Sequence, residues 1–174
     1  MSKFELFSDL GTLVVPDNYE HVNSLSYFRE ANYKSFRYFD DEINDDFFSN
    51  PTQVLKPGEN WQIKVFAQAA GNRISLTEGL AFLHSQGSVF TGAQGAALVF
   101  QQKYGLLPRG KQYNSLDTED RLPKCEGDCL VPWVSAYLGP VFEFSFTDMG
   151  HYTSDQEHYL FYDEDVFLGF FRKA

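Results

Sequence analysis

The sequence contains little cysteine, few basic side chains and no long apolar run. Two cysteines in 174 residues are too few for a disulfide framework. Apolar runs such as Ala96–Phe100 fall far short of the ~20 residues that span a bilayer. Lys3, Glu5 and Asp9 interrupt the apolar residues at the N-terminus, where a signal peptide needs an unbroken apolar core. We therefore predict a soluble, cytoplasmic protein.

Acidic side chains outnumber basic ones by 24 to 14, which gives a formal net charge of −10 and a pI near 4.7. This balance disfavours direct binding to nucleic acid or to an anionic membrane, because lysine and arginine dominate such binding. An acidic surface can instead bind a basic protein partner. The simpler interpretation is that the charge serves solubility alone.

The length and the hydrophobic content of 43% predict a single globular domain over residues 1–174. Helical and alternating apolar patterns are mixed in the first half, and the chain after Pro132 is rich in strand patterns. The predicted fold class is α+β: two or three helices packed on one face of a mostly antiparallel sheet, with a C-terminal β-meander.

Local signals place several elements. A strand or hairpin is expected over Phe4–Val15, and a helix over Asn18–Asn32 with an Asp17–Glu20 capping box. Ser75 and Glu78 form a second capping box, whose helix can end at Gly87 in the left-handed conformation. Residues 93–104 fit either a helix or a buried strand, and the small-residue spacing favours a helix. Alternation predicts strands over 61–66 and 141–146, and the β pattern of the C-terminal part continues over 166–171.

Aromatic side chains make up 17% of the chain, an unusually large share. Eight rings lie between Tyr27 and Phe48, interspersed with acidic residues. Two interpretations stay open: an aromatic core with ring-on-ring packing, or exposed rings beside carboxylates that recognise a protein. The second predicts a partner-binding surface formed by Tyr33, Tyr38, Asp41, Glu42, Asp45 and Asp46.

A second hypothesis is a small-ligand site or an enzyme pocket between the helix that the Ser75–Glu78 capping box begins and the C-terminal sheet. Its polar groups would be Gln94, Arg109, Lys111 and His151. The string Gly105–Gln112 has P-loop spacing, but Gln112 stands where the motif needs a hydroxyl, and no helical pattern follows. We therefore interpret this string as a structural loop.

The two cysteines, Cys125 and Cys129, have a spacing that occurs in zinc sites. A tetrad with His151 and His158 fits no standard module, and two ordinary thiols in a turn are the favoured interpretation. We predict no catalytic residue, no metal and no cofactor.

The order of elements, together with the string Leu107-Pro108-x-Gly110-Lys111, resembles a group of short uncharacterised bacterial proteins. Such proteins tend to carry Cys-Pro-x-Glu where this chain has Gly92-Ala93-Gln94-Gly95. The resemblance implies a microbial origin and no particular activity. The functional expectation is a small acidic, non-catalytic binding or regulatory protein, such as an inhibitor, an immunity-type protein or a phage accessory protein.

Overall fold

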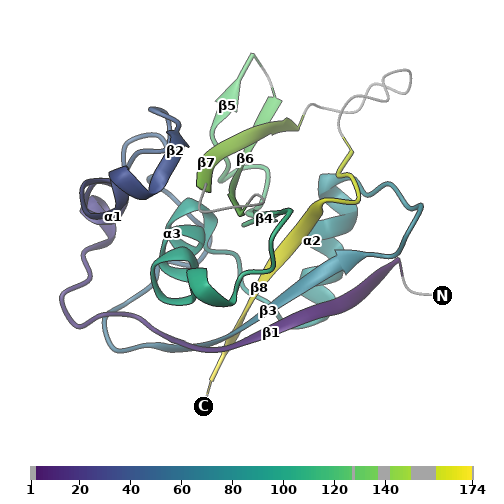
Figure 1. Cartoon of the computed structure of the whole chain (residues 1–174). Coiled ribbons are helices and arrows are strands. Elements are labelled where there is room, and N and C mark those ends of the chain that lie inside the picture. Colours follow the sequence, from purple (N-terminus) through teal and green to yellow (C-terminus); the bar gives the residue numbers. More distant parts are fainter. Residues whose placement is uncertain (1–2, 127, 137–141, 150–159, 174) are drawn as a thin grey trace.

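A computed structural model describes residues 3–126, 128–136, 142–149 and 160–173 (Figure 1). Three α-helices and eight strands lie within these ranges, joined in places by short 3-10 turns. The helices are α1 (Ser24–Asn32), α2 (Leu76–Ser85) and α3 (Gly92–Lys103). The strands are β1 (Phe4–Val14), β2 (Phe36–Phe39), β3 (Asn60–Gln68), β4 (Lys111–Asn114), β5 (Lys124–Cys125), β6 (Asp128–Ala136), β7 (Phe142–Met149) and β8 (Asp165–Arg172).

The strands form one mixed sheet in the order β1-β3-β8-β4-β6-β7-β2, with β5 paired to β6. Most neighbours are antiparallel, but β4 and β8 run parallel, as do β2 and β7. The expected C-terminal meander is found only in part. Strands β6 and β7 pair as successive antiparallel neighbours, whereas β8 leaves them and lies between β3 and β4. The class α+β is confirmed.

The expectation that the helices share one face of the sheet is wrong. Val166, Leu168 and Phe170 of β8 belong to the core cluster that contains α3 and the buried side of α1. Phe167, which points to the opposite face of the same strand, belongs to the cluster that contains the apolar side of α2. Apolar residues therefore cover both faces of β8, and helices pack against each of them.

Helix α3 is buried along most of its length, because every residue of Gly92–Phe100 is buried. The preference for a helix over 93–104 is thereby confirmed. Small residues let the helix approach the sheet closely. A Cβ added at Gly95 would lie 1.9 Å from Thr91 Oγ1 and 2.8 Å from Cζ of Phe170, so this position has no room for a side chain.

Helix α1 begins at Ser24, later than predicted, and the expected Asp17–Glu20 capping box is not formed. A carboxylate from elsewhere in the chain takes its place. The Asp45 oxygens accept hydrogen bonds from the backbone N–H groups of Leu25 and Ser26, both at 2.9 Å. The Ser75–Glu78 capping box of α2, by contrast, is present as predicted.

The aromatic rings are found partly in the core and partly at the surface, so an aromatic core accounts for part of the excess. Six phenylalanines interlock between α1, α3 and the β2–β7 edge, and the closest pair, Phe36 and Phe100, has ring centroids 4.7 Å apart. These six are Phe28, Phe36, Phe39, Phe100, Phe142 and Phe144. Several tyrosines are exposed, because a phenol can keep its hydroxyl in water.

Candidate functional site

The predicted partner-binding residues lie on η2 (Tyr33–Ser35), β2 and the loop that follows β2, beside α1 (Figure 1). The side chains of Tyr33 and Tyr38 are 62% and 51% exposed. Asp41, Glu42 and Asp46 are exposed as well. We call these five residues the acidic–aromatic surface. It borders β2, which ends the strand order of the sheet.

Internal contacts hold the acidic–aromatic surface in place. Asp41 forms an ion pair with Arg29 of α1, and its side chain still remains 91% exposed. The Tyr38 hydroxyl donates to Asp40 at 3.0 Å, and this hydrogen bond, together with the negative charge of Asp40, raises the pKa of the phenol. Asp40 also accepts from Glu42 N–H at 3.0 Å. These contacts fix the turn, so the exposed groups are displayed on an ordered backbone.

Asp45, the sixth predicted residue, has an internal role. Besides the two backbone bonds at the start of α1, its Oδ2 accepts from Ser26 Oγ at 2.7 Å. Both carboxylate oxygens are thus engaged by the helix N-terminus, where a negative charge is favoured. Because its carboxylate is bound by α1, we leave Asp45 out of the acidic–aromatic surface.

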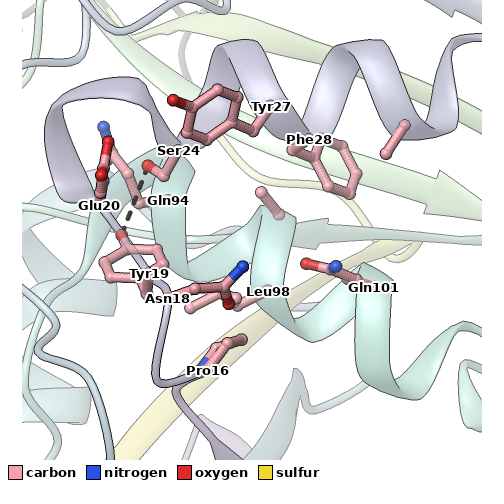
Figure 2. A pocket seen from close by; sticks show the side chains of 12 residues that line it. Pro16, Asn18, Tyr19, Glu20, Ser24, Tyr27, Phe28, Gln94, Leu98 and Gln101 are labelled. Carbon is pink, nitrogen blue, oxygen red and sulfur yellow. Dashed lines mark hydrogen bonds between the residues drawn. The ribbon is translucent and has the colours of Figure 1, made fainter.

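A groove opens between α1 and α3, and the chain segment that precedes α1 closes one side (Figure 2). Its volume is about 200 Å³. The lining residues are Ser24, Tyr27, Phe28 and Ala31 of α1, Gln94, Ala97, Leu98 and Gln101 of α3, and Pro16 with residues 18–20 of the preceding segment. On each helix the lining residues are spaced i, i+3, i+4, i+7, so they lie on one face of that helix. We call this feature the interhelical groove.

Two polar groups of the interhelical groove are buried or half-buried. Gln94 is 1% exposed; its Nε2 donates to the Phe48 carbonyl at 2.7 Å, while its Oε1 receives no hydrogen bond from the described residues. The Tyr19 hydroxyl lies 3.4 Å from Ser24 Oγ and 3.3 Å from His21 Nδ1. Burial raises the pKa of Tyr19 to about 12, so the phenol keeps its proton at neutral pH.

The residues of the second hypothesis have different surroundings in the structure. Gln94 lies in the interhelical groove. The exposed Arg109 places its guanidinium 4.8 Å from the ring centre of Phe142, and Lys111 Nζ donates to the Asp163 carbonyl at 2.8 Å. His151 lies outside the described residues. One ligand site shared by all four stays a prediction.

The loop interpretation of Gly105–Gln112 agrees with the structure, because Lys111 begins β4 where a phosphate-binding helix would have to start. Of the groove residues that precede α1, the sequence indicates Glu20 only as part of the expected capping box, and it does not single out Pro16 or Tyr19. The shared spacing marks one face of each helix, and it does not reveal that α1 and α3 face each other.

Cys125 is exposed and Cys129 is buried. Burial raises the pKa of the Cys129 thiol. Across the described ranges, no three side chains of the His, Cys, Asp and Glu types gather as metal ligands. His151 and His158 lie outside these ranges. None of the helices in the described part of the chain is long and apolar enough to cross a membrane.

The fold and the site together define an acidic α+β protein with a buried central helix, an exposed acidic–aromatic surface and an interhelical groove. Comparison with family models, with curated proteins and with solved structures gives no match for this chain.

Proposed function

We propose that this protein is a non-catalytic binding or regulatory protein, which engages a basic protein partner through the acidic–aromatic surface. The supporting observation is the exposure of Tyr33 and Tyr38 beside Asp41, Glu42 and Asp46 on a fixed turn. Tyrosine is enriched at protein interfaces because its ring buries a large apolar area while its hydroxyl stays hydrogen-bonded.

Charge supports a basic partner over an acidic one. Between Tyr27 and Phe48 there are six acidic and three basic side chains, so this segment carries 3 − 6 = −3 of the net charge of −10. Complementary charge speeds encounter and selects partners more than it adds affinity. The tyrosines are then expected to supply most of the binding energy, and the carboxylates most of the association rate.

Affinity capture from a lysate of the source organism at low and high salt tests this proposal, with bound proteins identified by mass spectrometry. The wild type is compared with the triple variant Asp41→Lys, Glu42→Lys and Asp46→Lys. The matched control reverses three exposed carboxylates elsewhere, Glu5, Asp163 and Glu164.

We expect one basic protein to be captured in near-stoichiometric amount by the wild type and the control, with less at high salt and little by the triple variant. Equal capture by both variants contradicts the surface assignment. An empty capture from the wild type contradicts the proposal of a protein partner.

A further inference from the structure

We propose that the interhelical groove binds an organic cation, namely an ammonium or guanidinium group on a short apolar stem. This proposal is independent of the acidic–aromatic surface. Its basis is a set of three features that meet in the groove: the charge of its lining, the aromatic rings around it and its apolar floor (Figure 2).

The charge of the lining favours a cation. Of the 12 lining residues, Glu20 alone is charged at neutral pH, and no lysine, arginine or histidine lines the groove. The protein as a whole carries a net charge of −10. A phosphate or carboxylate ligand would meet only repulsion from charged groups here, whereas a cation gains attraction from the carboxylate and from the surrounding field.

Three aromatic rings line the same space. Tyr27 and Phe28 come from α1, and Tyr19 comes from the segment before it (Figure 2). The face of an aromatic ring attracts a cation, and several rings with a carboxylate form a common type of ammonium site. Ser24 Oγ is an oxygen acceptor in the lining of this groove.

The apolar base and the volume of the groove determine the size and polarity of the ligand stem. Leu98 and Ala97 of α3, with Phe28 opposite, give an apolar base. The volume of about 200 Å³ lies below the ~300–1,000 Å³ of sites for drug-sized ligands. A chain of a few methylene groups with one cationic head therefore fits better than a nucleotide or a sugar.

Titration calorimetry and amide chemical-shift mapping with n-butylammonium and n-butylguanidinium test the proposal on the full chain. Pentanamide and pentanoate serve as neutral and anionic probes of similar size. We expect binding of both cations, with shifts around α1 and α3, weaker binding of the amide and none of the carboxylate. Bound cation also lowers the pKa of Tyr19, because a positive charge favours the phenolate.

Variants connect the binding to the groove. Glu20→Gln is expected to weaken cation binding about two- to fivefold, as for a partly solvated ion pair, while Glu30→Gln on the exposed side of α1 leaves it unchanged. Ala31→Phe at the groove opening should abolish binding, and Ala81→Phe at an exposed position of α2 is its control for folding. Tyr33→Ala, which changes the acidic–aromatic surface, should have no effect.

A further titration distinguishes a cation on a polypeptide side chain from a free small molecule. Binding of Nα-acetyl-arginine amide with the affinity of n-butylguanidinium shows a groove that accepts a side chain of a polypeptide. Binding of the free alkyl cations alone shows a small-molecule site. Equal binding of the cations and pentanamide, or no response to either cation, overturns the proposal.

Discussion

Asp45 is expected to stabilise α1 from a distance of 20 positions along the chain. The carboxylate accepts from two backbone N–H groups and one hydroxyl, at 2.9, 2.9 and 2.7 Å. Removal of a helix N-cap costs about 0.5–2 kcal/mol, and loss of a negative charge at a helix N-terminus costs about 0.3–1 kcal/mol more. We therefore expect Asp45→Ala to lower the free energy of unfolding by about 2 kcal/mol.

The same change should lower Tm by about 4–8 °C, since 1 kcal/mol corresponds to about 2–4 °C in a protein of this size. Asp45→Asn should cost about half as much, because the amide keeps one acceptor and loses the charge. Circular dichroism follows urea unfolding, which gives the free energy of unfolding, and thermal unfolding, which gives Tm, for the wild type, Asp45→Ala and Asp45→Asn. Asp46→Ala is the matched control, since Asp46 is exposed and, among the described residues, only its backbone N–H forms a hydrogen bond, to Asn44 Oδ1 at 3.1 Å. Equal stabilities for Asp45→Ala and Asp46→Ala would refute the assignment.

Two further predictions concern the core and the groove. Gly95→Ala should destabilise the fold by about 1–3 kcal/mol in thermal unfolding, because its Cβ would overlap Thr91, whereas Gly105→Ala, with open space around it, should be close to neutral. Tyr19 is neutral in the fold up to a pKa of about 12 against the ordinary value of 10.0, so its contribution to stability is complete below pH 10 and is lost as the pH rises towards 12. Tyr19→Phe should remove this loss of stability in unfolding experiments at alkaline pH. It should also remove one phenol that titrates at high pH when the absorbance of the folded protein is followed. An unchanged titration contradicts the burial of Tyr19.

Local elements could be predicted because their signals lie within a few residues. The Ser75–Glu78 box and the left-handed Gly87, with φ of 79°, are examples, and both are found in the structure. The strand order could not be predicted. The apolar run of β8 indicates a buried strand, and not that β3 and β4 are its neighbours.

Long-range contacts explain the misses around the site in the same way. A capping box at Asp17 and Glu20 fits the local pattern, yet the carboxylate of Asp45 takes the role after the chain turns back. The acidic–aromatic surface was accessible to sequence reasoning because its residues are close in sequence. The interhelical groove was not, since its walls come from Ser24–Asn32 and Gly92–Lys103, which only the tertiary fold brings together.

The central claim is that the acidic–aromatic surface attracts a basic partner. The most direct measurement is the association rate constant with the captured partner as a function of salt concentration, by stopped-flow fluorescence. We expect the rate constant to fall steeply with salt for the wild type and for the control reversed at Glu5, Asp163 and Glu164. We expect a slower, nearly salt-independent rate for the variant reversed at Asp41, Glu42 and Asp46. The same rate and the same salt dependence in all three proteins would contradict this claim.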